Sequence, residues 1–187
     1  KIVTAGPSSA GKSSLLMRIQ KNLFVSQQTP TITAACFSKS YSFKGEKIDF
    51  TFWDTAGQER FANLSPQYFR HCQFALLMFD QSDKESYDKM QSWHTQLVEK
   101  AGKDAKIYLL ANKCDLQPAL NRQEVQLYAN ENCVKLFYVS AKTGECVDAV
   151  INDMLAEYAT NAGIVEQQYD QSAQLIGFDP IIKKSCC

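Results

Sequence analysis

Short apolar runs alternate with amphipathic segments along most of this 187-residue chain. A short uninterrupted apolar run is typical of a strand that lies between layers of helices in a parallel sheet. Runs of this kind are found at Ile2 to Ala5, Phe74 to Asp80, Lys106 to Asn112 and Leu136 to Ser140. The pattern therefore predicts an open, mostly parallel α/β sheet, whose ligands bind at the carboxyl ends of the strands.

One region instead alternates in steps of two residues, which is typical of strands with one polar face. The residues that share the apolar face are Phe37, Tyr41 and Phe43, followed after a polar turn at Lys44 to Lys47 by Ile48, Phe50 and Phe52. This region is predicted to be a hairpin.

The helices are predicted from apolar positions that recur at helical spacing, first at Lys12 to Gln20. Ser82 and Glu85 match a capping box that opens a helix running to about Lys100, and Asn121 opens a shorter helix in the same way. The buried face of the last helix is predicted to consist of Val147, Val150, Ile151, Met154, Leu155 and Tyr158.

Length and charge limit the possible functions. The chain can form one well-buried core but is too short for two ordinary domains. We expect one domain over residues 1–160 and, because periodicity is lost from Asn161, a flexible tail over residues 161–187. Twenty Lys and Arg residues balance twenty Asp and Glu residues, so overall charge does not favour nucleic acid as a partner.

The seven cysteines are odd in number and unevenly spaced, which is typical of reduced thiols in a cytosolic protein. Neither they nor His71 and His94 have the spacing of a zinc site. The apolar runs are far shorter than the roughly 20 residues that cross a bilayer, and no secretory leader is visible. We expect no transition-metal site and no transmembrane helix.

The segment from Gly6 to Ser13 fits the phosphate-loop pattern and lies between a predicted strand and a predicted helix. Gly6 and Gly11 let the backbone turn so that its N–H groups and the helix N-terminus face a polyanion. Lys12 would contact the β- and γ-phosphates, and the Ser13 hydroxyl would bind Mg²⁺. Asp54 ends another strand and would hold the same cation through water, although such an Asp can also be a turn or capping residue.

The segment Asn112 to Asp115 ends the next strand and indicates which base is bound. The two oxygens of the Asp115 carboxylate can accept from the N1–H and the exocyclic amine of guanine, whereas adenine has no matching donors. Ser140 to Lys142 follow the last strand and would offer backbone N–H groups to the guanine O6. These residues therefore favour GTP over ATP.

Together these motifs resemble those of the Ras superfamily of small GTPases, and within it the Rab family, over essentially the whole chain. Trp53 to Arg60 is similar to the second switch of Rab proteins, and Thr31 to Ala35 with Leu64 to Arg70 resembles the early-endosomal branch. The resemblance implies the P-loop small-GTPase fold, a mostly parallel six-stranded sheet with helices on both faces and one antiparallel strand. It also implies slow hydrolysis of GTP to GDP and phosphate with Mg²⁺.

The resemblance assigns further roles. Thr31 would bind Mg²⁺ through its hydroxyl and the γ-phosphate through its N–H, and Gln58 would orient the attacking water; with Lys12 these are the catalytic candidates. Phe24 would stack on guanine, the alternative being a core residue that packs at the end of the first helix. The nucleotide contacts are predicted to be Ser8, Ser9, Ala10, Gly11, Lys12, Ser13, Ser14, Phe24, Thr31, Gly57, Asn112, Lys113, Asp115, Ser140, Ala141 and Lys142, and the metal ligands Ser13, Thr31 and Asp54.

Some positions depart from the family pattern. Pro7 removes one N–H from the phosphate loop, and Thr33 replaces the usual glycine after the switch threonine. Because of these departures, one alternative function stays possible, namely a binding module that holds GTP without useful hydrolysis. A second alternative, an adenine-nucleotide phosphotransferase built on the same loop, is disfavoured by Asp115.

The chain ends in Cys186 and Cys187 without a C-a-a-X box, which resembles the Rab signal for two geranylgeranyl groups. Two lipid chains anchor a protein stably, whereas one does not; two unmodified tail cysteines are the alternative. We expect a monomer on the cytosolic face of endomembranes, endosomal ones in particular, that acts in vesicle trafficking. The implied partners are effectors, an exchange factor, a GTPase-activating protein, Rab escort protein and GDP-dissociation inhibitor.

Overall fold

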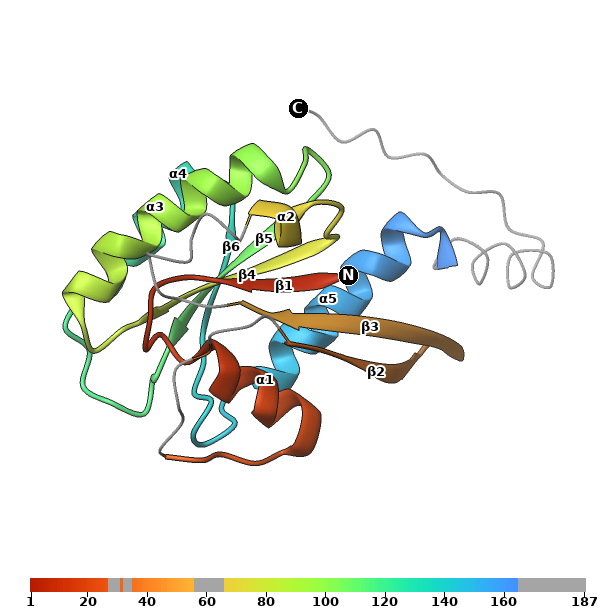
Figure 1. Cartoon of the computed structure of the whole chain (residues 1–187), viewed down its shortest axis with the longest axis horizontal. Helices are drawn as coiled ribbons and strands as arrows, with labels where there is room; N and C mark the ends of the chain where they lie inside the picture. The colour runs from red at the N-terminus through yellow and green to blue at the C-terminus, as the bar shows by residue number, and fades with distance from the viewer. Residues whose placement is uncertain (27–30, 32–34, 56–65, 165–187) are drawn as a thin grey trace, which may run out of the picture.

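The computed structural model describes residues 1–26, 31, 35–55 and 66–164 and contains a six-stranded sheet in the order β2-β3-β1-β4-β5-β6 (Figure 1). The strands are β1 (Ile2–Ala5), β2 (Ala35–Phe43), β3 (Glu46–Asp54), β4 (Phe74–Asp80), β5 (Lys106–Asn112) and β6 (Lys135–Tyr138). Only β2 is antiparallel to its neighbour, and every other pair is parallel. The predicted α/β fold is confirmed.

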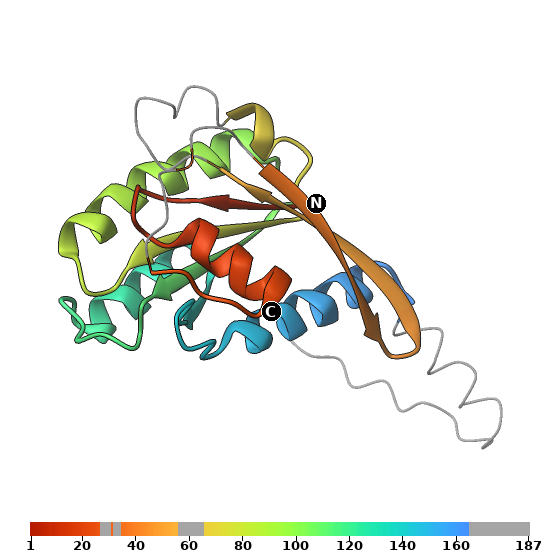
Figure 2. The ribbon, with the colours of Figure 1, turned by 60° about the horizontal axis from the view of Figure 1, so that its bottom comes forward.

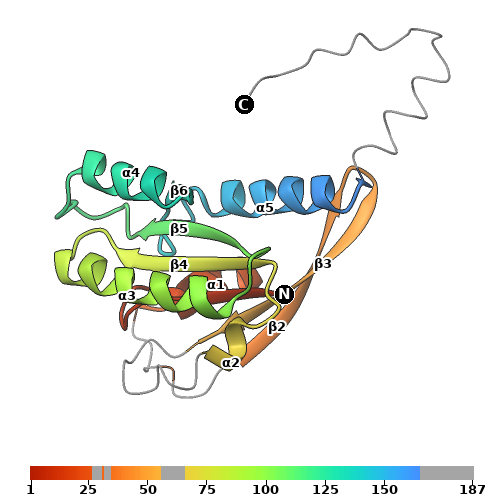
Figure 3. The same cartoon turned by 90° about the horizontal axis from the view of Figure 1, so that it is seen from above.

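Helices cover both faces of this sheet, as Figures 2 and 3 show from two further directions. The helices are α1 (Lys12–Lys21), α2 (Pro66–Phe69), α3 (Lys84–Lys100), α4 (Arg122–Glu131) and α5 (Val147–Asn161). Side chains of α1 and α5 form one core cluster with the sheet, and those of α3 and α4 form a second cluster on the opposite face. None of the helices in the described part of the chain has the length and apolar character needed to cross a membrane.

Strand β4 contributes apolar side chains to both faces of the sheet. All seven of its residues are buried. Phe74, Leu76 and Met78 pack with α1 and α5, while Ala75, Leu77 and Phe79 pack with α3 and α4. Fully burying a Leu or Phe side chain contributes roughly 1.5–3 kcal/mol, so both faces of this strand hold the sheet between its helices.

The β2–β3 hairpin has a tighter turn than the sequence predicts. Phe43 pairs with Glu46, so only Lys44 and Gly45 form the turn, with φ angles of 50° and 85°. Two positive φ angles give a turn whose twist matches that of the strands, which is why Lys47 already belongs to β3.

The predicted cap of α3 is wrong by one residue. Asp83, not Ser82, accepts the N–H of Glu85, at 3.0 Å. Ser82 is engaged elsewhere, since its N–H and its hydroxyl both donate to Asp80 Oδ1, at 2.9 and 2.6 Å. The cap predicted for α4 is confirmed, because the Asn121 side chain accepts a backbone N–H in the first turn of that helix.

The last strand is shorter than predicted. It ends at Tyr138 rather than Ser140. The N–H of Ser140 donates to the Glu145 carbonyl at 3.1 Å, so the chain has already turned into the loop that precedes α5. Other predicted bounds agree closely, since β1, β4 and β5 begin and end where the apolar runs do.

Gly6, at the end of β1, is expected to be intolerant of a side chain. Its φ is +136°, and an added Cβ would collide with the backbone carbonyl of Met78 on β4. We expect Gly6→Ala to lower the free energy of unfolding by about 2–4 kcal/mol, through backbone strain and overpacking together. Urea unfolding measures this. Gly45→Ala is the matched control, because Gly45 also has a positive φ but nothing within 4 Å of its Cβ position; equal losses in both variants would contradict the assigned collision.

Candidate nucleotide-binding site

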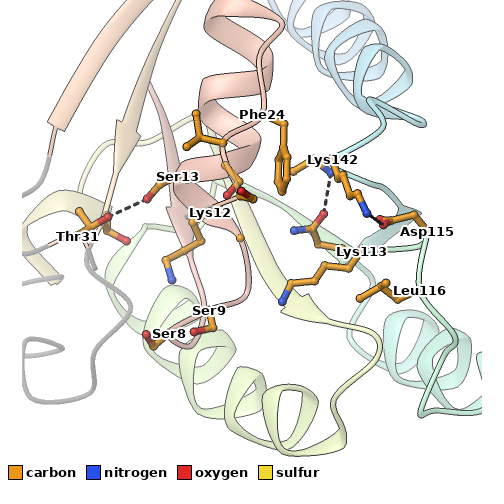
Figure 4. Close-up of a pocket in the computed structure, with 17 residues that line it drawn as sticks. Ser8, Ser9, Lys12, Ser13, Phe24, Thr31, Lys113, Asp115, Leu116 and Lys142 are labelled. Atoms are coloured by element: carbon orange, nitrogen blue, oxygen red, sulfur yellow. Dashed lines mark hydrogen bonds and ion pairs between the residues drawn. The ribbon is translucent and has the colours of Figure 1, made fainter. Parts of the chain in front are cut away.

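A cavity of about 390 Å³ lies where the loops after β1, β5 and β6 meet (Figure 4). The structure brings together thirteen of the predicted contacts around it: Ser8, Ser9, Gly11, Lys12, Ser13, Ser14, Phe24, Thr31, Asn112, Lys113, Asp115, Ala141 and Lys142. Four further residues line it that the sequence did not single out: Val25, Ser26, Thr55 and Leu116.

Of the remaining candidates, three do not line the cavity and two fall outside the described residues. Ala10 and Ser140 are fully buried and do not line the cavity, although both bond to residues that do. Asp54 is also absent from the lining and contacts the side chains of Ser13 and Thr31. Gly57 and Gln58 fall outside the described residues.

One end of the cavity is formed by the phosphate-loop residues. Lys12 is only 5% exposed, and its ammonium group donates to the carbonyls of Gly6 and Pro7, at 2.7 Å each. Gly11 has a φ of 89° and caps α1 without a side-chain hydrogen bond. A buried ammonium group beside a helix N-terminus gives this end of the cavity a positive potential suited to phosphates. Pro7, which has no N–H to offer, contributes its carbonyl to the lysine instead.

Three oxygen-bearing side chains gather beside this end. Ser13 Oγ lies 2.8 Å from Thr31 Oγ1. Asp54 Oδ1 is buried and has no hydrogen-bond partner among the described residues. Burial raises the pKa of Asp54 above its ordinary value, although hydrogen bonds from Ser13 and Thr31 and the charge of Lys12 act in the opposite direction. A buried carboxylate oxygen without a partner, next to two hydroxyls, is a donor set that fits Mg²⁺.

The other end of the cavity presents the Asp115 carboxylate. Ser140 Oγ donates to Asp115 Oδ1 at 2.6 Å, and the Lys142 ammonium group lies 3.9 Å from Oδ2. Asn112 joins the two ends, because its Nδ2 donates to the Ala10 carbonyl at 2.8 Å and its Oδ1 accepts the Ala141 N–H at 3.1 Å. The phosphate loop and the loop after β6 are therefore held together by one buried amide.

The loop after β6 was expected to offer its backbone N–H groups to the guanine O6, but two of these groups already have partners within the protein. The N–H of Ala141 donates to Asn112, and the N–H of Ser140 donates to Glu145. A buried N–H without a partner is costly, so the fold satisfies both groups internally. A guanine O6 could use the Ala141 N–H only by sharing it.

The side chain of Phe24 is not part of the core. It is 37% exposed, lines the cavity, and points into it in Figure 4. The alternative interpretation, a core residue at the end of the first helix, is therefore wrong. Its ring is placed where a planar base could lie against it.

Two contacts that fasten the site have no counterpart in the sequence motifs. Lys113 forms an ion pair of 2.5 Å with Asp80, at the end of the neighbouring strand. Burial acts to raise the pKa of Asp80, but the hydrogen bonds from Lys113 and Ser82 lower it below its ordinary value. Thr55 donates through its hydroxyl to the Thr4 carbonyl at 2.7 Å and so ties the end of β3 to β1. Only the pairing of the strands reveals these contacts.

Comparison with known proteins identifies the class of molecule that this fold and cavity define. The model of the Ras family matches residues 1–160. The chain therefore belongs to the Ras family of small GTPases. Its relatives, which include proteins named Rab5 and RABF2a, place it more narrowly in the Rab family, and it is a GTP hydrolase.

Three relatives illustrate the match. The chain is 41% identical to GTP-binding protein YPT53 of Saccharomyces cerevisiae over 153 residues, which cover 78% of this chain and 70% of that protein. It is 33% identical to Ras-related protein RABF2a of Arabidopsis thaliana over 192 aligned residues, covering 100% and 94%. It is 37% identical to Ras-related protein Rab5 of Nicotiana tabacum over 161 residues, covering 85% and 78%. Rab-family GTPases act in vesicle trafficking, and Ras-family GTPases in general use GTP, GDP and Mg²⁺.

Proposed function

We propose that this GTPase is a lipid-anchored switch on the cytosolic face of endosomal membranes, which recruits effectors in its GTP form and releases them after hydrolysis. The observation that carries the proposal is the single cavity that has Lys12 at one end and Asp115 at the other. Membership of the Rab family and the resemblance to the early-endosomal branch support the endocytic setting.

In this proposal one end of the cavity binds the phosphates of GTP and the other end binds its guanine base. The Lys12 ammonium group and the N-terminus of α1 bind the phosphates. The Asp115 oxygens accept from the N1–H and amine of guanine, and Phe24 covers a face of the base. The base and the phosphates are thus recognised by groups that Asn112 holds at a fixed separation.

Ser13, Thr31 and Asp54 would hold Mg²⁺. When bound, the cation neutralises charge that develops on the β- and γ-phosphates during transfer. The described structure already places Thr31 within hydrogen-bond distance of Ser13, so Thr31 itself lies at the phosphate end of the cavity. We infer that the γ-phosphate holds Thr31 there and that loss of the γ-phosphate releases it, which makes the surface recognised by effectors dependent on GTP.

Gln58 carries the proposed hydrolytic step by orienting the attacking water. We expect Gln58→Leu to lower the rate of GTP hydrolysis in the presence of a GTPase-activating protein by roughly 10³-fold or more, while leaving GTP affinity within about twofold. Single-turnover release of phosphate measures the rate. Gln126→Leu, on the exposed face of α4, is the matched control. Equal rates in Gln58→Leu and the parent would assign water positioning to another residue.

The terminal cysteines are proposed to carry two geranylgeranyl groups, delivered with Rab escort protein, and GDP-dissociation inhibitor is proposed to bind the lipidated monomer and extract it from the membrane. We expect the tagged protein with both Cys186 and Cys187 replaced by Ser to be diffuse in its own cell, whereas the parent is on membranes, because one or no lipid chain binds only marginally. Replacement of the exposed Cys133 by Ser is the control. Membrane association that persists without both terminal cysteines would contradict the proposed anchor.

A further inference from the structure

Arg18, in the last turn of α1, makes contacts that neither the phosphate loop nor the guanine motif accounts for. Its Nε donates to the Ala141 carbonyl at 3.0 Å, and its Nη2 donates to the Lys142 carbonyl at 2.5 Å. Both carbonyls belong to residues that line the nucleotide cavity, although Arg18 itself does not line it. The guanidinium therefore holds the loop after β6 from outside the nucleotide cavity.

The same guanidinium also holds the end of its own helix. Its Nη1 donates to the backbone carbonyl and to the side-chain oxygen of Asn22, at 2.8 and 2.9 Å. Asn22 has a left-handed conformation, with φ of 54°, and ends α1 two positions before Phe24. Arg18 thus links the segment that leads to Phe24 with the loop that carries Ala141 and Lys142.

A short chain of hydrogen bonds connects the carbonyls held by Arg18 to the Asp115 carboxylate, which is predicted to bind guanine. Because a peptide unit is planar, fixing the Lys142 carbonyl also fixes the N–H of Thr143. That N–H donates to Ser140 Oγ at 3.1 Å, and Ser140 Oγ in turn donates to Asp115 Oδ1 at 2.6 Å. By the same geometry, the carbonyl of Ala141 held by Arg18 directs the N–H of Lys142 away from the guanidinium.

We propose that Arg18 is a positioning residue for guanine recognition: it holds the loop after β6 so that Ser140 orients the Asp115 carboxylate, and it thereby slows the release of GDP. This inference rests on the proposed nucleotide site. Asn112 holds the loop by the N–H of Ala141, and Arg18 holds it by two carbonyls. A planar, charged fork of donors suits this task, since its hydrogen bonds are stronger and more directional than those of neutral groups.

The surroundings of Arg18 allow a clean test. Arg18 lines a second cavity of about 280 Å³, so a smaller side chain at this position enlarges an existing space and collides with nothing. Lys39 lines the same cavity and donates to the Ile19 carbonyl at 2.6 Å. Lys39 is a partly buried cation that contacts α1 but, among the described residues, makes no hydrogen bond or ion pair to the loop after β6, and Lys39→Met is therefore a matched control.

The experiment compares the full-length parent with Arg18→Met, Arg18→Lys and Lys39→Met. Release of fluorescent GDP, chased with excess GTP, is expected to be about tenfold faster in Arg18→Met, because charge-assisted hydrogen bonds to the loop are lost. Arg18→Lys should fall between this variant and the parent, since an ammonium group keeps the charge but lacks the planar fork of donors that binds both loop carbonyls and Asn22 at once. Lys39→Met should stay within about twofold of the parent.

Base preference separates positioning from mere support of the fold. Inosine diphosphate lacks the exocyclic amine that Asp115 accepts from, so the parent should prefer GDP to it, and Arg18→Met should show a several-fold smaller preference. GDP release within twofold of the parent, or an unchanged base preference with only a lower melting temperature, would overturn this inference alone. A parent protein that fails to bind GDP would overturn the proposed function as well.

Discussion

Asp115→Asn is expected to weaken the binding of GTP and GDP by roughly 10²–10⁴-fold. The Asp115 oxygens are predicted to accept from two donors of guanine, and hydrogen bonds to a charged group are worth about 1.5–3 kcal/mol each. An amide in this place turns one acceptor into a donor, which then faces a donor of the base. The substitution also removes the negative charge that lies 3.9 Å from the Lys142 ammonium group. It further weakens the hydrogen bond that Ser140 Oγ donates to this side chain.

The same substitution should change which base is preferred. Xanthine carries an oxygen where guanine has its amine, so the new amide N–H₂ has an acceptor to meet, and xanthosine triphosphate should compete better than GTP in the variant. Displacement of fluorescent GDP by GTP, xanthosine triphosphate and ATP measures this. Asp88→Asn, on the exposed face of α3, is the control. The assignment of Asp115 would be refuted if the variant bound GTP as tightly as the parent, or if the parent bound ATP as tightly as GTP.

Lys12→Met is expected to lower the affinity for both GTP and GDP by roughly 10²-fold or more. The substitution removes the buried ammonium group that is predicted to bind the phosphates, and it leaves the carbonyls of Gly6 and Pro7 without the two bonds that they now accept. Both nucleotides should be affected, because both carry the β-phosphate. The loss should therefore leave the preference for guanine over adenine largely unchanged, in contrast to Asp115→Asn.

Equilibrium titration with fluorescent GDP and with a non-hydrolysable GTP analogue measures the effect of Lys12→Met. Lys21→Met, at the exposed end of the same helix, preserves the helix and changes the same net charge. Urea unfolding of both variants establishes that each is folded at the temperature of the titration. Comparable affinities in Lys12→Met and Lys21→Met would show that the phosphates are held elsewhere.

Much of the fold could be predicted because its signals are local. The apolar runs of β1, β4 and β5 need no distant partner to be recognised, and the helix that follows the phosphate loop was predicted to within one residue at its end. The phosphate-loop and guanine motifs were recognised for the same reason, since each follows a strand, whereas the roles of Thr31 and Phe24 came from the family resemblance. The division at residue 160 stays a prediction, and so does the lipidation of Cys186 and Cys187, which lie outside the described part of the chain.

The errors occurred where a local signal competed with a contact across the sheet. Ser82 has the sequence signature of a helix cap, but Asp80 takes both its donors and leaves the cap to Asp83. The N–H of Ala141, which was predicted to bind the guanine O6, donates to Asn112 in this structure, and its use by a base stays a prediction. A motif specifies which groups are available, whereas the neighbouring strand decides which of them already have partners.

By itself, the sequence was enough to identify a small GTPase of the Ras superfamily, because glycine spacing, one lysine and one aspartate form motifs that predict binding of phosphates and guanine. Only the tertiary structure decided how the two ends of the site are held together. The β4–β5 register sets Asp80 opposite Asn112, and α1 brings Arg18 to the carbonyls of a loop more than 120 positions away in the chain. Such contacts depend on chain closure over long sequence separations, which hydrophobic period and residue spacing do not encode.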